Sequence, residues 1–340
     1  MRLKKILLTA ALIILGSHAA EAQDANVLKA LLSRIHINGY LQAGYEYKDA
    51  GDDTSSSFNI KRTVVWARAD ITERWYFMFM YNFNAEVQEF YTDYRITKGK
   101  QLSVRLGQFK SSLSMENPIY PTQLELIDLC SQGVTYLAGI GGDPLYGVNY
   151  GRDLGIMLFG ELFRGKMYYE LAVMNGQGVN CTDGNSDKDI LLKLEYRPIT
   201  QLRFVASGQK GRGNAVATSI WNPGIEAGDD YTRDRLTAGG EWKDSLLGLR
   251  GEALWGKDGS VKSWGAYLTA RVTVRKNLDI IASADYFDRN TKMECDQTNL
   301  TAGIQYWYYK NCRVQLQYTR VLTQSDGDYN VVQAQVQVAF

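Results

Sequence analysis

Apolar and polar residues alternate along most of the chain in short runs. In the first run, 36–47, Ile37 and Leu41 lie on one face, and Asn38 and Gln42 lie on the other. A period of two is the pattern of a strand that buries one face and exposes the other. The same alternation returns in three later runs: 262–274, 299–308 and 331–340. The pattern therefore predicts an all-β protein.

Very short and longer polar connections join these runs in turn. Lys98-Gly99-Lys100 is one of seven short links, and 176–188 and 211–233 are two of eight longer ones, which gives sixteen strands. An even number of strands with one short rim and one long rim is typical of bacterial outer-membrane barrels. The sequence therefore predicts a 16-stranded antiparallel transmembrane β-barrel.

Two further features favour a membrane barrel over a soluble sandwich, which would also alternate. Aromatic residues gather where strand ends would meet lipid headgroups, with Trp75 and Tyr196 at the short rim and Tyr47 and Trp255 at the other. No proline lies inside a predicted strand, and Pro198 falls in a short link. Every backbone donor must be satisfied in lipid, so this absence fits a membrane barrel.

One long segment, 110–152, interrupts the alternation. It holds three of the five prolines: Pro118, Pro121 and Pro144. Thr122 and Glu125 have the spacing of a capping box before a short apolar run, which predicts the start of a short helix. Loops of this length are uncommon unless they are functional or disordered. We expect the segment to lie at or in the mouth of the barrel.

The N-terminus has the three parts of a secretory signal peptide: basic residues within 2–5, an apolar run over 6–16, and Ala20-Glu21-Ala22 as the cleavage site. We therefore predict a signal peptide over 1–22, a barrel over 23–340, and a location in the cell outer membrane. No mature segment has 18 consecutive apolar residues, so no transmembrane helix is expected.

Charge and chemistry exclude several other classes of protein. The signal peptide takes three of the 38 basic residues and one of the 37 acidic residues, which leaves 35 against 36. Such a balance gives no electrostatic footprint for nucleic acid. The two histidines are His18, in the signal peptide, and His36, near a rim, so a Ser-His-Asp site would depend on His36. We expect no enzyme activity and no metal or other cofactor.

Four cysteines follow the signal peptide: Cys130, Cys181, Cys295 and Cys312. None has the spacing of a metal site. Disulfides are permitted in an exported chain, and Cys130 and Cys181 would both lie in loops on one side. A bridge between them is one alternative, and free thiols are the favoured one.

Two predicted strands have no clear lumen face. The run 75–83 is apolar on both faces, and 58–70 carries Lys61 and Arg62, which alternation would place on opposite faces. We leave the lumen side of both strands open.

Several short motifs, taken in order, resemble a known family. They are Val104-Arg105-Leu106-Gly107-Gln108-Phe109-Lys110, Met115-Glu116-Asn117, Gly151-Arg152-Asp153-Leu154-Gly155 and Met174-Asn175-Gly176. Their order and spacing are similar to those of the phosphate-selective porins of Gram-negative outer membranes, with the best match over 58–176. The resemblance implies a barrel that is usually a homotrimer, a long third extracellular loop folded inward to narrow the pore, and lumen arginines that guide anions.

Alternation directs nine basic side chains into the lumen, where polar groups set the selectivity of a channel. They are Arg95, Arg105, Lys193, Arg203, Arg235, Lys243, Arg250, Arg271 and Arg313. A similar number of acids points the same way. The bases and acids could pair across neighbouring strands and simply hydrate the wall, or the bases could form a track for anions. The sequence leaves both open.

The long segment itself is acidic. Lys110 and Arg152 stand at its ends, and the charged residues between them are Glu116, Glu125, Asp128 and Asp143. We expect these six residues to line a constriction. An acidic constriction repels phosphate and favours cations or neutral solutes, so phosphate is not the expected substrate.

We therefore expect a porin in outer-membrane lipid that passes small hydrophilic solutes or inorganic ions by passive diffusion. The alternative is a non-conducting barrel, plugged by the segment 110–152, that binds a ligand or partner through its extracellular loops.

Overall fold

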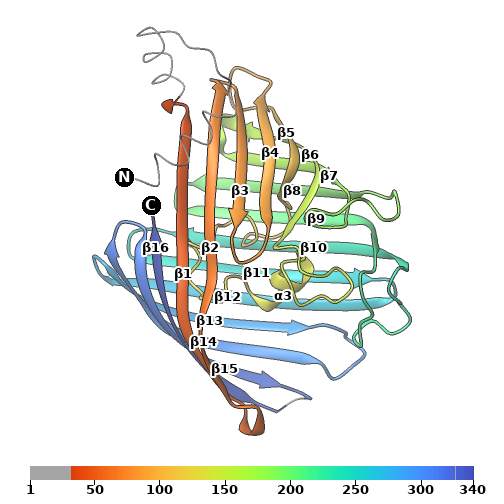
Figure 1. Ribbon diagram of the computed structural model, residues 1–340, viewed down its shortest axis with the longest axis vertical. Coiled ribbons are helices and arrows are strands. Elements are labelled where there is room, and N and C mark those ends of the chain that lie inside the picture. Colours follow the sequence, from red (N-terminus) through yellow and green to blue (C-terminus); the bar gives the residue numbers. More distant parts are fainter. Residues whose placement is uncertain (1–31, 326) are drawn as a thin grey trace, which may run out of the picture. The chain divides into compact units, whose positions relative to one another are not determined.

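The computed structural model describes residues 32–325 and 327–340 (Figure 1). The chain divides into two units, one up to His36 and one over 37–340, and the barrel belongs to the second. The predicted signal peptide, 1–22, lies outside the described residues. None of the helices in the described part is long and apolar enough to cross a membrane.

Sixteen strands form a closed barrel, as predicted (Figure 1). Their bounds are β1 Ile35–Asp49, β2 Ser55–Thr72, β3 Trp75–Asn82, β4 Val87–Arg95, β5 Ser103–Lys110, β6 Arg152–Leu162, β7 Met167–Met174, β8 Asp189–Ile199, β9 Leu202–Asn214, β10 Asp230–Lys243, β11 Leu247–Asp258, β12 Val261–Arg275, β13 Leu278–Asp288, β14 Asp296–Tyr309, β15 Cys312–Thr323 and β16 Tyr329–Ala339. Each strand lies beside its neighbours in sequence, and β1 pairs with β16 to close the ring. Within the described residues, the helical elements with given bounds are α3, Gln132–Leu137, and two short 3₁₀ turns, η1 Gly51–Asp53 and η2 Phe163–Gly165.

The alternating residues of β16 form a polar face toward the lumen and an apolar face toward the outside. Gln333, Gln335 and Gln337 are buried on the lumen side, whereas Val336 and Val338 are exposed on the outer face. An apolar outer face matches what lipid requires of a barrel wall. Polar groups on the inner face find hydrogen-bond partners across the strands, since the Gln335 amide donates to Gln315 Oε1 at 2.9 Å.

The strand that is apolar on both faces has an apolar partner inside the barrel. Met78 and Met80 of β3 are buried on the lumen side. Met78 belongs to a cluster with Phe109 of β5 and Met157 of β6. The inner face of β3 therefore packs against side chains rather than water, which explains why its sequence does not alternate.

The structure answers the open question of the lumen face at Lys61 and Arg62, and it shows that one local prediction, for Pro198, was wrong. Lys61 and Arg62 of β2 both reach lumen-side groups, because Lys61 Nζ lies 2.8 Å from Asp128 Oδ1 and Arg62 donates to Gln42 Oε1 at 2.9 Å. Strict alternation therefore fails at this point of the strand. Pro198 lies within β8 rather than in a link, where the pairing with β9 shifts register after Tyr196. A proline is tolerated at such an irregularity, because no regular ladder bond is needed there.

All four cysteines are free, as favoured. Cys130 is buried and Cys181 is exposed, so the alternative of a bridge between them is not realised.

Candidate pore constriction

The chain between β5 and β6, residues 111–151, folds into the barrel; we call it the inner loop. Its helix α3 lies within the outline of the barrel in Figure 1. Val134 and Leu137 of α3 share a hydrophobic cluster with Leu254 of β11 and Phe287 of β13. Since these wall residues are more than a hundred positions away in sequence, the loop is packed against strands remote from its own.

Part of the inner loop, 121–129, reaches the wall opposite its origin; we call it the crossing segment. Gln317 Nε2 and Gln315 Nε2 donate to the carbonyl of Glu125 at 2.7 and 2.9 Å. Arg313 donates to the carbonyl of Leu124 at 2.8 Å. The side chains of β15 thus donate to backbone carbonyls that, in a helix, would accept hydrogen bonds from the helix's own N–H groups.

The predicted helix start at Thr122 was therefore wrong, and the helix begins at Gln132 instead. A capping box needs the Glu125 carboxylate to turn back to the N–H of Thr122. In the structure this carboxylate forms an ion pair with Arg250 of β11. Contacts with the distant wall override the local pattern.

Every acid of the inner loop has a basic partner on the wall. Glu116 lies 3.4 Å from Arg250 and Glu125 pairs with the same guanidinium, which also meets Glu241 at 3.2 Å. Asp128 pairs with Lys61 at 2.8 Å, and Asp143 lies 3.9 Å from Arg235. Three cations, on β2, β10 and β11, therefore partly offset the four acidic charges of the loop.

The six predicted constriction residues differ in exposure. Glu116 and Asp143 are each 1% exposed, while the side chain of Asp128 is 66% exposed and that of Glu125 is 13% exposed. Lys110 donates to the carbonyls of Asn117 and Ile119, and Arg152 pairs with Glu89 at 2.7 Å. Only Glu125 and Asp128 therefore combine a negative charge with access to solvent.

Glu116 has an unusual electrostatic setting. Burial raises the pKa of its carboxyl to about 7, and the neighbouring Arg250 only partly opposes this effect. The backbone N–H of Ser131 donates to Oε2 at 2.8 Å, whereas Oε1 has no hydrogen-bond partner among the described residues. Burial, reinforced by the nearby Asp258, also raises the pKa of Asp143.

Most of the predicted pore-lining bases are paired with acids. Arg105 meets Asp93 at 2.7 Å, Arg203 meets Glu241 at 2.7 Å, Arg235 meets Asp258 at 2.8 Å and Arg271 meets Asp279 at 3.4 Å. Lys193 is buried and stands opposite Glu170 in the register of β7 and β8. Arg313 donates to Gln305 as well as to the crossing segment. The geometry of these residues matches the paired-wall alternative.

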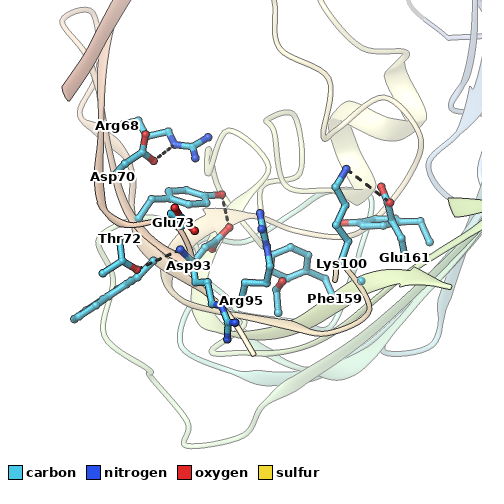
Figure 2. A pocket seen from close by; sticks show the side chains of 15 residues that line it. Arg68, Asp70, Thr72, Glu73, Asp93, Arg95, Lys100, Phe159 and Glu161 are labelled. Carbon is cyan, nitrogen blue, oxygen red and sulfur yellow. Dashed lines mark hydrogen bonds and ion pairs between the residues drawn. The ribbon is translucent and has the colours of Figure 1, made fainter. Parts of the chain in front are cut away.

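Arg95, which is exposed, lies at the short-link rim in a cavity of about 240 Å³ (Figure 2). Four basic residues line it: Arg68, Arg74, Arg95 and Lys100. Four acids line it as well: Asp70, Glu73, Asp93 and Glu161. Ion pairs join Arg68 to Asp70 and Lys100 to Glu161. The rim cavity is thus mixed in charge, like the wall.

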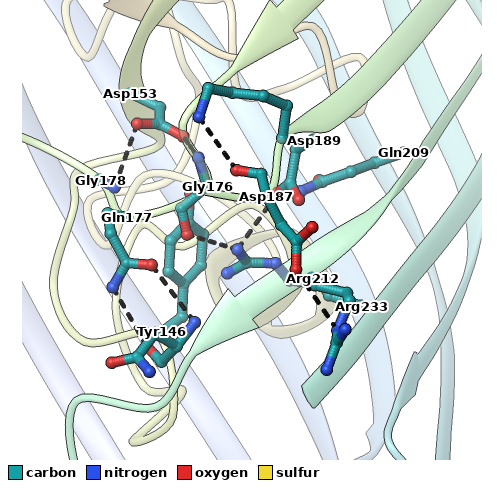
Figure 3. Close-up of polar contacts among 12 residues, drawn as sticks. Tyr146, Asp153, Gly176, Gln177, Gly178, Asp187, Asp189, Gln209, Arg212 and Arg233 are labelled. Atoms are coloured by element: carbon teal, nitrogen blue, oxygen red, sulfur yellow. Dashed lines mark hydrogen bonds and ion pairs between the residues drawn. The ribbon is translucent and has the colours of Figure 1, made fainter. Parts of the chain in front are cut away.

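The C-terminal part of the inner loop is anchored by one buried arginine (Figure 3). Arg233 of β10 is 0% exposed and stacks 3.9 Å above the ring of Tyr146. It also pairs with Asp189 at 3.2 Å and donates to the carbonyl of Gly176. The inner loop is therefore tied at this end to β10 and to the connection after β7.

Two further cavities lie on the two sides of the crossing segment. One, of about 530 Å³, is lined by crossing-segment residues Thr122, Gln123 and Glu125, by Tyr120 just before them, and by rim residues such as Asn311; we call it the mouth cavity. The other, of about 240 Å³, is lined by Leu126 and Asp128 and by β14 residues near the long loops. The crossing segment thus lies between the two mouths of the barrel.

Sequence reasoning missed the groups that position the loop. Gln42, Gln315, Gln317, Gln333 and Gln337 hydrogen-bond to inner-loop atoms. Glutamines at every second position of neighbouring strands were a visible signal of a polar lumen face. Their role as loop partners depends on the path of the loop, which the alternation does not give. Within the described part of the chain, no cluster of three or more His, Cys, Asp or Glu side chains could hold a metal.

Comparison with known proteins gives a likeness of fold. No family model matches the chain. No curated protein matches it either. The resemblance to phosphate-selective porins therefore stays a prediction.

Solved outer-membrane barrels do match nearly the whole chain. OprB of Pseudomonas putida has a TM-score of 0.65 at 10% identity, covering 96% of this chain and 100% of OprB. The outer-membrane channel DcaP of Acinetobacter baumannii has 0.63 at 12%, covering 90% and 97%. OmpT of Vibrio cholerae, an outer-membrane protein in its trimer form, has 0.63 at 13%, covering 90% and 99%. The chain has the fold of an outer-membrane barrel.

Proposed function

We propose that this protein is an outer-membrane porin that passes small hydrophilic solutes or ions by passive diffusion. The observation that carries the proposal is the inner loop, which is docked inside a closed 16-stranded barrel by ion pairs and hydrogen bonds to the opposite wall. A barrel of this size leaves an aqueous lumen, and a docked loop narrows it. Export through a cleaved signal peptide and a location in outer-membrane lipid belong to the same proposal.

The charge distribution supports weak selectivity. The acids of the inner loop are partly offset by Lys61, Arg235 and Arg250, which reduces the negative field that the constriction presents to a passing ion. Asp128 keeps most of its side chain exposed. We therefore propose a modest preference for cations and neutral solutes over anions such as phosphate.

Planar-bilayer recordings in a salt gradient test this proposal. Refolded protein is expected to give discrete conductance steps with a small reversal potential of cation sign. Changing the two solvent-accessible acids together, Glu125→Gln with Asp128→Asn, is expected to shift the reversal potential toward anions. Asp143→Asn is the matched control, because this buried acid should leave the reversal potential unchanged. An unchanged potential in the double variant would show that the loop does not line the path.

A specific observation favours a second function, a non-conducting barrel that binds a ligand or partner through its long loops. The crossing segment bonds directly to β15, and separate cavities lie on its two sides. Absence of conductance steps from folded protein would support this alternative and refute the porin.

We also propose a homotrimer and no catalytic activity. OmpT of Vibrio cholerae, with a similar fold, is described in a trimer form, and DcaP as a channel. Mass measurement of the detergent-solubilised protein tests the assembly, since a monomeric mass would refute it.

A further inference from the structure

The mouth cavity combines aromatic surfaces with free polar groups. It lies between the crossing segment and the rim of short links, and its lining comes from both. Trp66 of β2 and Tyr120 of the inner loop are stacked there, with ring centroids 6.3 Å apart and ring planes 5° apart. Tyr40 of β1 and Trp66 form a T-shaped pair, with ring centroids 6.2 Å apart. Trp307 of β14 lines the same cavity.

Several polar side chains of the lining have no partner of their own. Asn38, Thr122, Gln123 and Asn311 line the cavity, and none of their side chains makes a hydrogen bond within the described part of the chain. Amide and hydroxyl groups both donate and accept. They are therefore available to a ligand that carries many hydroxyl groups.

The formal charges of the lining cancel. It contains two cations, Lys243 and Arg271, and two anions, Glu125 and Asp279. Arg271 and Asp279 lie 3.4 Å apart, and Glu125 is paired with Arg250. A cavity without net charge gives no advantage to a charged ligand over a neutral one.

We propose that the mouth cavity is a binding subsite for a neutral saccharide. A sugar ring has an apolar face of C–H groups, which fits an aromatic surface, and an edge of hydroxyl groups, which fits amides. The cavity volume of about 530 Å³ falls in the range of small-ligand sites, ~300–1,000 Å³. The proposal rests on the porin function and names a class of solute for it.

The test is block of the ion current by maltose added to the mouth on the side of the short links. Maltose is expected to interrupt the current in a saturable way, because a bound sugar would occlude the path. Sorbitol, a linear polyol that lacks the apolar ring face, is expected to block much more weakly. Equal block by sorbitol at equal concentration would overturn the proposal.

Variants of the aromatic surface sharpen the test. Trp66→Leu and Tyr120→Leu are each expected to raise the half-blocking concentration of maltose about tenfold. Tyr120→Phe keeps the ring and should stay within about twofold of the wild type. Trp221→Leu, in a long loop, is the matched control and should leave the block unchanged. An unaltered half-blocking concentration in both leucine variants, with normal conductance, would overturn the proposal.

A second measurement separates this proposal from the porin function. Maltose binding to the detergent-solubilised, folded protein can be followed by tryptophan fluorescence, without any conductance. Maltose-dependent quenching that is reduced by Trp66→Leu is expected and supports the subsite even if no channel opens. Conductance without block and without quenching would overturn the subsite and leave the porin standing.

Discussion

The lumen has two unlike walls, and the inner loop runs from one to the other. On one side Met78, Tyr91, Phe109, Met157 and Met174 form what we call the apolar wall. On the other side Gln315, Gln317, Gln333, Gln335 and Gln337 of β15 and β16 form what we call the glutamine wall. The chain leaves the apolar wall at Lys110 and is hydrogen-bonded at the glutamine wall.

The two walls have different roles: the apolar wall contributes to the stability of the barrel, and the glutamine wall sets the position of the crossing segment. Apolar packing is non-directional and scales with the area removed from water, so the apolar wall stabilises the barrel without fixing the loop. Hydrogen bonds have defined distances and angles, so the glutamine wall fixes where the crossing segment lies. Ion pairs of Glu116 and Glu125 with Arg250 of β11 further stabilise the docked loop.

Removing Arg250 is expected to have the largest effect. Arg250→Ala leaves Glu116, Glu125 and Glu241 without their shared cation. Breaking a buried ion pair from one side costs about 3–5 kcal/mol, so the crossing segment should detach. We expect higher single-channel conductance and a stronger cation preference in bilayer recordings. Arg271→Ala, whose acidic partner Asp279 lies on the wall, is the control and should keep the loop docked.

Truncating a large side chain in the apolar wall should lower the stability of the barrel rather than change the selectivity of the channel. Phe109 is 0% exposed, and Phe109→Ala should destabilise the barrel by about 3–5 kcal/mol. We expect a lower midpoint in denaturant unfolding and an unchanged reversal potential, because the loop contacts of the glutamine wall are intact. A change of selectivity without loss of stability would contradict the division between the walls.

Loss of the glutamine contacts should loosen the loop with little effect on the barrel. Gln315→Leu with Gln317→Leu removes both side-chain donors to the Glu125 carbonyl. Each bond is worth about 0.5–1.5 kcal/mol, so excess current noise from loop motion is expected in open-channel recordings. Thr319→Val is the control, since its hydroxyl is hydrogen-bonded to Thr301 of β14 rather than to the loop. Equal noise in the control would argue against a positioning role.

The smallest expected effect concerns pH. The pKa of Glu116 rises from 4.5 to about 7 when the inner loop is docked. The docked state therefore keeps a proton that the undocked state loses, and docking weakens as pH rises from about 4.5 to 7. We expect excess current noise to grow over this range and to level off above it. Glu116→Gln should flatten this dependence, and a wild type without any pH dependence would contradict it.

The fold could be predicted because the alternation of side chains along a strand is a local property of the sequence. A strand in a barrel shows one face to lipid and one to the lumen, and this alternation is written into runs such as 331–340. Alternation did not predict the orientation of side chains whose partners are distant in the sequence. The apolar lumen face of β3 packs against β5 and β6, and Lys61 turns toward Asp128 of the inner loop.

The candidate site was harder to predict for the same reason. The sequence reveals the four acids of the inner loop, but it does not show that Arg250, Lys61 and Arg235 meet them. The spacing of Thr122 and Glu125 also predicted a helix cap, whereas the carboxylate and the carbonyl of Glu125 both bind the wall. Contacts between residues this far apart in sequence carry no local pattern.

The pairing of β1 with β16 has a consequence for how the protein assembles. Tyr40 stands opposite Ala339, and Asp49 opposite Asn330. The seam of the ring thus joins the first strand to the last, and bringing such distant residues together is entropically costly and slow. Until that seam forms, β1 and β16 each present a row of unpaired backbone groups. Assembly should therefore be completed only after the last strand is available, with the seam as the final step.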